Sequence, residues 1–319
     1  MQLTEACEQF LSHCEYEKKL SPHSLRAYRN DLGHFTDSVG GNASSENLTA
    51  TEIEAAAQLW LIDPELKAAT VKRRIACIKS MVRWLFRKRL IKANPLENLD
   101  LEIKLPKRLP RNLQTAEIKT LLAIKPDGLA NETRKEERPA LLRRRWDILT
   151  ARLAIEVMTL TGVRVGELVR VRQSQIDFVL QQIRILGKGN RERLVSFPDP
   201  VTTARLERYQ KQALYLFGPQ PHCTLFVNGL GRPANEQYIR RIVRLYAQAA
   251  QLERRITPHM LRHTAATQLL EAGVDIRFVQ RILGHGSITT TEIYTHVSDH
   301  VLRAEISRAN IRKRLEMQR

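Results

Sequence analysis

The sequence predicts a mainly α protein with two domains, the second of which carries a small antiparallel β-sheet among its helices. Three observations support this fold class. Apolar residues recur at helical spacing through most of the chain. Alternation of apolar and polar residues is confined to one short stretch past the middle of the chain. The chain has 319 residues, a length that suits two hydrophobic cores better than one.

Four helices are expected in the first hundred residues. Two apolar stripes, separated by Ser21-Pro22, indicate the first pair. A loop rich in glycine and serine follows at 40–45, and further helices are expected at 49–61 and about 70–90. The two stripes consist of Leu3, Cys7, Phe10, Leu11 and Cys14, and of Leu25, Tyr28, Leu32 and Phe35.

The fourth of these helices has a strongly basic face. Residues 67–92 contain ten Lys or Arg and no Asp or Glu, and the whole chain has a net charge of +18. Such unbalanced charge is typical of contact with the phosphates of double-stranded DNA. A solvated helix face and binding to anionic lipid are the alternatives, and composition alone does not exclude them. The residues expected to contact DNA on this helix are Lys72, Arg73, Arg74, Lys79 and Arg83.

A stiff basic connector is predicted between the two domains. Residues 104–111 include two prolines and four cations, which favour an extended chain. Lys107 and Arg108 within it are further expected DNA contacts. The predicted boundaries are 1–103 for a helical DNA-binding domain, 104–112 for the linker and 113–319 for the second domain.

The second domain is expected to be mostly helical. It begins with a short helix at 115–124, an irregular charged stretch at 125–143 and a long helix that ends at Thr161-Gly162. Alternating apolar residues on both sides of the glycine-containing segment 187–190 predict a β-hairpin. Further helices are expected at 200–217, 235–250, 258–272 and 276–283.

Composition excludes several classes of protein. No apolar run reaches the ~18 residues of a membrane span, and the first residues lack the pattern of a secretory signal, so a cytoplasmic protein is expected. Clusters of carboxylates that would bind Mg²⁺ or Zn²⁺ are not found, so neither a metal nor a cofactor is expected. The four cysteines are scattered and are interpreted as small buried hydrophobes; they are Cys7, Cys14, Cys77 and Cys223.

The motif TPHMLRH at 257–263 is the most informative stretch of the second domain. Thr257 suits an N-cap and Pro258 suits the first helical position, so His259 lies in a first turn, where free N–H groups favour an anion. Arg262 shares this face and can grip two phosphate oxygens. Taken alone, the motif is as consistent with a helix that carries an incidental His and Arg as it is with a phosphate-binding site.

Three other candidates carry little information singly. Arg164 follows a glycine turn at the start of a helix, where Glu167 is either a structural ion-pair partner or a support for an active-site arginine. Lys188 lies at a hairpin tip, where most lysines are merely solvated. Tyr294, nine residues after His285, has an ordinary pKa of about 10, so attack by its oxygen needs a base or a cationic pocket.

The motifs TGVRVGEL, GKGNRER, TPHMLRHTAATQLLEAG and LGHGSITTTEIYTH, in this order, closely resemble those of the tyrosine recombinases, also called the phage integrase family. The Xer-like branch is the most similar, and the resemblance covers nearly the whole chain. It implies a site-specific DNA recombinase, an enzyme that cleaves and rejoins strands through a 3′-phosphotyrosine in integration, excision or dimer resolution.

The resemblance implies a role for each residue that handles the phosphate. Tyr294 would attack the scissile phosphate, and Arg164 and Arg262 would bind its non-bridging oxygens. Lys188 would protonate the leaving 5′-oxygen. His285 would donate a hydrogen bond to the phosphate.

The resemblance further implies supporting residues and partners. His259 would exchange the proton of the tyrosine, and Glu167 corresponds to a supporting acidic position. Four protomers would assemble on DNA, with the C-terminal segment 299–319 docked on a neighbouring protomer. A related recombinase or an accessory protein is allowed as a further partner.

Two alternatives remain: a catalytically silent DNA-binding regulator, which belongs to a different class, and a type IB topoisomerase-like protein that nicks and closes DNA, which is a mechanistic neighbour. The presence of all six site residues argues against the regulator. The sequence does not determine the DNA target, the choice between integrase, transposon or integron recombinase and dimer resolvase, or a homo- or heterotetramer. It also leaves open the role of the charged segment 125–143.

Overall fold

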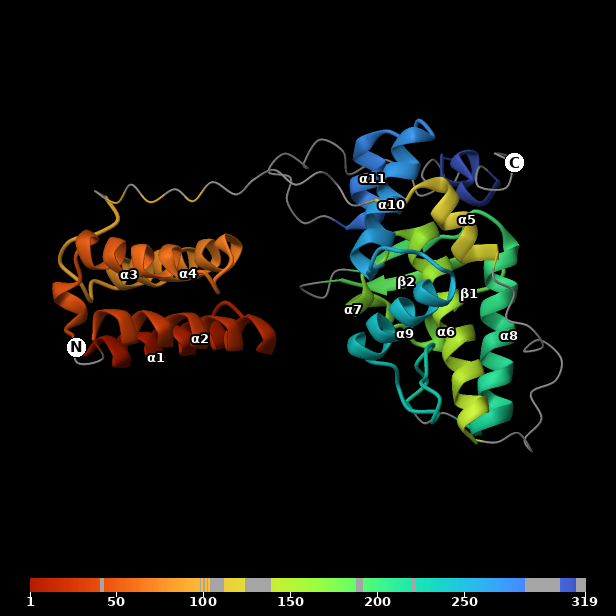
Figure 1. The fold of residues 1–319 in the computed structure, drawn as a ribbon, viewed down its shortest axis with the longest axis horizontal. Coiled ribbons are helices and arrows are strands. Elements are labelled where there is room, and N and C mark those ends of the chain that lie inside the picture. Colours follow the sequence, from red (N-terminus) through yellow and green to blue (C-terminus); the bar gives the residue numbers. More distant parts are fainter. Residues whose placement is uncertain are drawn as a thin grey trace. The chain divides into compact units, whose positions relative to one another are not determined.

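Two mostly helical units follow one another along the chain (Figure 1). In this computed structural model they comprise Met1–Arg108 and Leu109–Arg319, and each is described by itself. The predicted mainly α class with a small antiparallel sheet is confirmed. The structure describes residues 1–40, 43–97, 99, 101, 103, 112–123, 139–187, 192–219, 222–284 and 305–313.

The described part of the first unit is built from helices around one apolar core. The largest buried side chains of this core include Phe10, Phe35 and Met81. The expected stripes face it, because their residues recur every three or four positions. The helices are α1 (Leu3–Tyr16), α2 (Pro22–Val39), η1 (Ser45–Asn47), α3 (Ala50–Ile62) and α4 (Ala68–Arg87).

Local features of the side chains or the backbone decide where three of these helices begin or end. Ser21 caps α2 by accepting from the backbone N–H of Ser24. Thr49 and Glu52 form a reciprocal capping box at the start of α3. The last helix, α4, ends at Arg87 and not near residue 90, because Arg89 adopts a left-handed φ of 58°.

The basic face of α4 is smaller than the sequence predicted, and the prediction was wrong for Arg74. Arg74 is only 7% exposed, and its guanidinium lies over the ring of Trp60, 5.2 Å from the centroid. The reason is spacing: residue 74 falls between Val71 and Ile78 on the apolar stripe of the helix. A buried arginine in this position packs inside the unit and does not offer its charge to DNA.

The other predicted contacts of α4 differ in their exposure. Lys72, Arg73 and Arg83 are exposed, as expected, and Lys79 is partly buried. Arg73 forms an ion pair with the buried carboxylate of Asp31, and the Nζ of Lys79 donates a 2.9 Å hydrogen bond to the carbonyl of Leu101.

The second unit is organised around a long central helix, α6. Helices α5, α8, α9 and α10 all pack against it. Trp146 of α6 is buried, stacks on Tyr209 of α8 and donates a 3.0 Å hydrogen bond to the carbonyl of Val227. The helices are α5 (Thr115–Ala123), α6 (Pro139–Thr161), α7 (Val165–Leu168), η2 (Gln173–Gln175), α8 (Pro200–Phe217), α9 (Glu236–Ala249), α10 (Pro258–Glu271) and α11 (Ile276–Leu283).

The predicted hairpin is present within a three-stranded antiparallel sheet. Strand β2 (Gln182–Leu186) pairs with β3 (Glu192–Ser196), and Ile183 lies opposite Val195. A short strand β1 (Ile176–Asp177) adds to the other edge of β2. The irregular charged stretch is shorter than predicted, since 139–143 belong to α6; its residues 125–138 lie outside the described residues, as does the connector 104–111.

The described part of the C-terminal segment packs on its own unit. Ile306, Ala309 and Ile311, which belong to the segment expected to dock on a neighbouring protomer, are buried in the core of the second unit. Arg312 pairs with the fully buried carboxylate of Glu156 and with Asp199. Docking of this segment on a neighbouring protomer stays a prediction.

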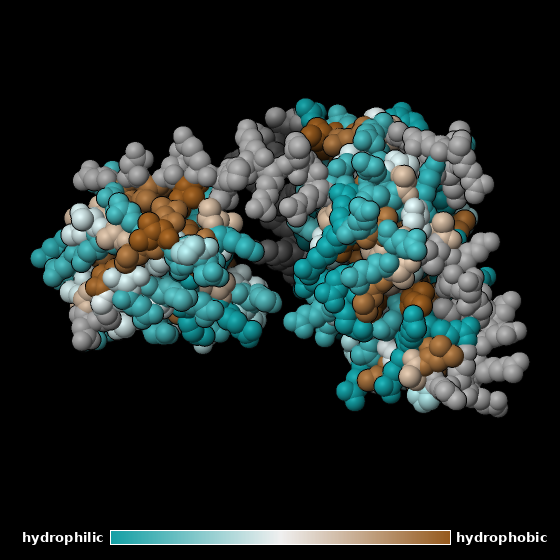
Figure 2. All heavy atoms as spheres, in the orientation of Figure 1, coloured by the Kyte–Doolittle hydropathy of each residue, from teal (hydrophilic) through white to brown (hydrophobic). Residues whose placement is uncertain are grey.

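The surface is mostly polar. Figure 2 shows hydrophilic side chains over most of the visible face of each unit, with smaller hydrophobic areas between them. Within the described ranges, no helix combines the length and the apolar composition needed to cross a membrane.

Candidate functional site

The site begins where α6 ends. Gly162 follows the last residue of α6 with a left-handed φ of +67°, and a Cβ there would lie 2.3 Å from Cδ2 of Leu283. Only glycine fits this turn and this close approach to the end of α11. The turn, predicted from the TG pair, brings Arg164 to the N-cap position of α7.

Glu167 holds Arg164 in place, as the sequence suggested. One carboxylate oxygen of Glu167 accepts from the backbone N–H of Arg164, and the other accepts from its guanidinium, both at 2.9 Å. The carboxylate is buried, whereas the side chain of Arg164 is 43% exposed. The buried acid therefore fixes an arginine whose other face is open to a ligand.

A second arginine, Arg193 of β3, contacts the same carboxylate. Its two terminal nitrogens donate to the two oxygens of Glu167 at 3.0 and 2.7 Å. Burial alone would raise the pKa of Glu167, but hydrogen bonds from Arg193 and from the backbone of Arg164 lower that pKa to about 2. Glu167 is therefore ionised throughout the physiological range.

Arg262 approaches from α10. It is 4% exposed and donates to the carbonyls of Gly162 at 2.6 Å and Leu283 at 2.7 Å. Burial, and then the positive charge of Arg164, lower its pKa to about 10, so it remains a cation at neutral pH. The guanidinium is thus held by two backbone oxygens of the described residues, and these two bonds use only two of its five N–H donors.

The C-terminal end of α11 is where the three arginines meet. Successive carbonyls there accept from Arg193 (Ile282, 3.0 Å), from Arg262 (Leu283, 2.7 Å) and from Arg164 (Gly284, 3.2 Å). Carbonyls at a helix C-terminus lack partners inside the helix and carry negative partial charge. They therefore stabilise three cations that would otherwise repel one another.

His259 lies in the first turn of α10, as predicted. Thr257 caps this helix by accepting from the backbone N–H of Met260, and Pro258 occupies the first helical position. Burial lowers the pKa of His259, and the nearby His263 and Arg262 lower it further. The imidazole therefore favours its neutral form and can accept a proton at neutral pH.

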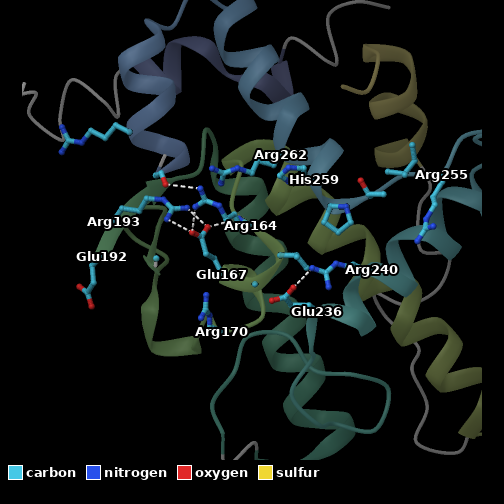
Figure 3. A pocket seen from close by; sticks show the side chains of 18 residues that line it. Arg164, Glu167, Arg170, Glu192, Arg193, Glu236, Arg240, Arg255, His259 and Arg262 are labelled. Carbon is cyan, nitrogen blue, oxygen red and sulfur yellow. Dashed lines mark hydrogen bonds and ion pairs between the residues drawn. The ribbon is translucent and has the colours of Figure 1, made fainter. Parts of the chain in front are cut away.

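These residues line one open pocket of about 1050 Å³. Figure 3 shows Arg164 and Arg193 converging on Glu167, with Arg262 and His259 on the neighbouring helix. Its described lining is strongly cationic: Arg164, Arg170, Arg193, Arg240, Arg255, Arg262 and Arg281, against Glu167, Glu192 and Glu236. Such a pocket suits a polyanion.

The remaining predicted site residues lie outside the described residues. These are Lys188, His285 and Tyr294, together with the connector residues Lys107 and Arg108. Two neighbours in the chain are nevertheless informative. Gly187 and Gly284, which immediately precede Lys188 and His285, both line the pocket.

Arg193 is the residue that the sequence interpretation missed. The sequence pattern could have indicated it. Arg193 is two residues before the buried Val195 in β3, so both side chains lie on the core side of the strand. A charge in such a position requires a buried partner. Which carboxylate supplies it depends on how the sheet docks against α7.

Comparison with known proteins shows two family matches. Residues 133–300 match the phage integrase family, and residues 7–89 match the phage integrase N-terminal SAM-like domain. Tyrosine recombinase XerC of Herpetosiphon aurantiacus is 34% identical over 306 residues, which cover 93% of this chain and 92% of that protein. Tyrosine recombinase XerD of Staphylococcus epidermidis is 31% identical over 300 residues, covering 93% of this chain and 95% of that protein.

The fold also resembles solved structures. A lambda integrase tetramer bound to a Holliday junction superposes with a TM-score of 0.64 at 19% identity, covering 91% of this chain and 79% of that one. At this level of identity the likeness concerns the fold.

Proposed function

Because the chain belongs to the phage integrase family and is a site-specific DNA recombinase of the Xer-like branch, we propose that its arginine pocket binds the scissile phosphate that Tyr294 attacks. The observation that carries this assignment is the convergence of Arg164 and Arg262, from α7 and α10, beside His259 in one pocket. Two guanidiniums fixed from behind by backbone and carboxylate oxygens form a preorganised anion site.

In this proposal the arginines stabilise charge that develops on the phosphate. Arg164 and Arg262 contact the non-bridging oxygens, and their positions are set by Glu167 and by the end of α11. Because these contacts exist before DNA arrives, little reorganisation accompanies the reaction. Glu167 supports the site and does not touch the phosphate.

The proton transfers are assigned to the remaining residues. The lowered pKa of His259 keeps its imidazole neutral, so it can take the proton of Tyr294 as the phenol oxygen bonds to phosphorus. Lys188 protonates the 5′-oxygen as its bond to phosphorus breaks, and His285 donates to a phosphate oxygen. The products are a 3′-phosphotyrosine and a free 5′-hydroxyl, which attacks the partner strand's phosphotyrosine.

We assign DNA binding outside the site to the first unit and the connector. Lys72 and Arg83 on the exposed side of α4 contact phosphates, together with Lys107 and Arg108. Four protomers assemble on two duplexes, by analogy with the lambda integrase tetramer bound to a Holliday junction. The protein acts in the cytoplasm, with a related recombinase or an accessory protein as a further partner.

The nucleophile is tested on DNA selected from random duplexes by the protein itself. A nicked suicide substrate made from the selected site traps a covalent adduct, which denaturing electrophoresis resolves. We expect Tyr294→Phe to bind this DNA with unchanged affinity and to form no adduct, because only the phenol oxygen is lost. Tyr16→Phe, at an exposed tyrosine of α1, is the matched control and should form the adduct normally. An adduct with Tyr294→Phe assigns the nucleophile elsewhere.

A further inference from the structure

Arg193 makes contacts that no role assigned so far explains. Its guanidinium is largely buried, with the side chain 14% exposed. It donates to both oxygens of Glu167 and, through Nε, to the carbonyl of Ile282. All three guanidinium nitrogens are thus engaged with α7 and α11, while Arg193 itself belongs to β3.

The three segments joined in this way each lead to a site residue. Strand β3 pairs with β2, and Lys188 belongs to the segment that connects these two strands in the sequence. Glu167 holds Arg164 through its backbone and side chain. Ile282 is three residues before His285, and Gly284, which lies against the guanidinium of Arg193, is the residue before it.

We propose that Arg193 is a positioning residue of this recombinase: it ties the hairpin, the Glu167–Arg164 pair and the end of α11 into one arrangement, and so acts on the reaction without touching DNA. The inference rests on the proposed roles of Arg164, Lys188 and His285. It assigns to Arg193 no contact with the phosphate.

The hydrogen bonds of Glu167 explain how the loss of Arg193 would affect Arg164. Glu167 has two carboxylate oxygens, and each accepts one bond from Arg193 and one from Arg164. Removing Arg193 takes one of the two donors from each oxygen of a buried carboxylate, which favours a change in its orientation or its protonation. Either change moves Arg164, because Arg164 is held by the same two oxygens.

The test compares variants of Arg193 with a control in single-turnover cleavage of the suicide substrate, with DNA affinity measured separately. Arg193→Gln removes the charge and the bidentate pairing. Arg193→Lys keeps the charge but cannot donate to Glu167 and Ile282 together. Arg184→Gln is the matched control, because Arg184 is an exposed arginine of the neighbouring strand β2.

We expect Arg193→Gln to slow cleavage at saturating DNA by roughly 100-fold, the effect that an ångström of misplacement can produce. Its DNA affinity should change no more than that of Arg184→Gln. Arg193→Lys should recover part of the rate. A combined Arg193→Gln and Glu167→Gln variant should be no slower than the slower single variant, because the two residues act through one contact.

A pH profile provides a readout that a purely structural role would not change. Glu167 faces Arg164 of its own helix, Arg193 of β3 and Arg262 of α10, and Glu236 of α9 lies beside Gly166. Without Arg193, the pKa of Glu167 rises, because the hydrogen bond from Arg193 is the largest influence that lowers it. As the pH is lowered, cleavage by Arg193→Gln should therefore fall at a higher pH than cleavage by the wild type, and this fall should be absent from the double variant, which has no carboxyl group at 167.

The outcomes distinguish failure of the proposed function from failure of the positioning role of Arg193. A wild-type protein that forms no adduct on its selected site contradicts the proposed function itself. If the wild type reacts, the positioning role is overturned by Arg193→Gln cleaving at the rate of Arg184→Gln, or by rate losses of Arg193→Gln and Glu167→Gln that add in the double variant. Should Arg193→Gln melt below the assay temperature, Arg193→Lys is judged by the same two criteria.

Discussion

Arg164 and Arg262, which belong to helices far apart in the sequence, donate to the same backbone oxygen, that of Leu283 at the end of α11. The two distances are 3.5 and 2.7 Å. A shared acceptor fixes the separation of the two guanidiniums before any phosphate binds. Because Leu283 is two residues before His285, the same contact also relates both arginines to the start of the segment that leads to Tyr294.

Arg262 should matter far more for cleavage than for DNA binding. We expect Arg262→Lys to slow adduct formation by about 100- to 1000-fold, the range for loss of one preorganised donor, with affinity nearly unchanged. It should also lower the melting temperature, because lysine lacks the two separate terminal nitrogens that donate to the carbonyls of Gly162 and Leu283. Single-turnover rates, a binding titration and thermal melting measure the three effects. A loss of DNA affinity without a loss of cleavage rate would show that Arg262 contributes to ground-state binding of DNA.

Salt dependence separates the exposed and buried cations of α4. Arg83→Ala should weaken binding to all DNA sequences and reduce the slope of log affinity against log salt by about one. Arg74→Ala should leave that slope unchanged and lower the melting temperature, because Arg74 packs on Trp60 inside the unit. Titrations at several salt concentrations check this pair. Equal slopes for Arg83→Ala and the wild type would remove α4 from the DNA interface.

Glu167 should contribute to stability in a pH-dependent way. Its folded pKa, about 2, lies below its ordinary value of 4.5, so the contribution is complete above pH 4.5 and is lost as the pH falls toward 2. At about 1.4 kcal/mol per pKa unit, the contribution at neutral pH is roughly 3 kcal/mol. Glu167→Gln should therefore be less stable than the wild type at pH 7, with the gap narrowing below pH 4.5.

Denaturant unfolding across this pH range measures that gap. Glu236→Gln is the control, since Glu236 forms an exposed ion pair with Arg240 and should change stability little at any pH. A constant gap between Glu167→Gln and the wild type down to pH 3 is incompatible with the depressed pKa.

Cleavage should persist in EDTA. Arginine and histidine side chains supply the positive charge around the phosphate, so the proposed chemistry includes no metal ion. The adduct assay is run with the chelator and again after adding Mg²⁺. A loss of cleavage that Mg²⁺ specifically restores would show that side-chain cations are insufficient.

Arg312 should anchor the C-terminal segment to its own unit. Arg312→Met removes the partner of the buried Glu156 and of Asp199, and breaking a buried pair costs about 3–5 kcal/mol. Arg205 also pairs with Glu156, which places the expected loss at the lower end of this range. Arg308→Met, at an exposed pair with Glu305, is the control and should melt like the wild type. Equal melting temperatures for both variants would contradict the anchor.

The sequence by itself determined the features that depend on neighbouring residues. Thr257 with Pro258, and Asp199 with Pro200, start α10 and α8 where they were expected, because a cap and the backbone N–H groups that donate to it lie within three residues. The hairpin followed from alternation, and the pairing of Arg164 with Glu167 followed from a spacing of three.

The tertiary structure decided which charges are buried and what they meet. Whether Arg74 faced DNA or Trp60, and whether Arg193 met Glu167, depended on how helices and strands distant in sequence dock against one another. The contacts of Arg164 and Arg262 with the backbone oxygen of Leu283 likewise form only after α6, α10 and α11 have packed together. Local periodicity assigns a residue to a face, but its partner across an interface is set by long-range packing, which periodicity does not encode.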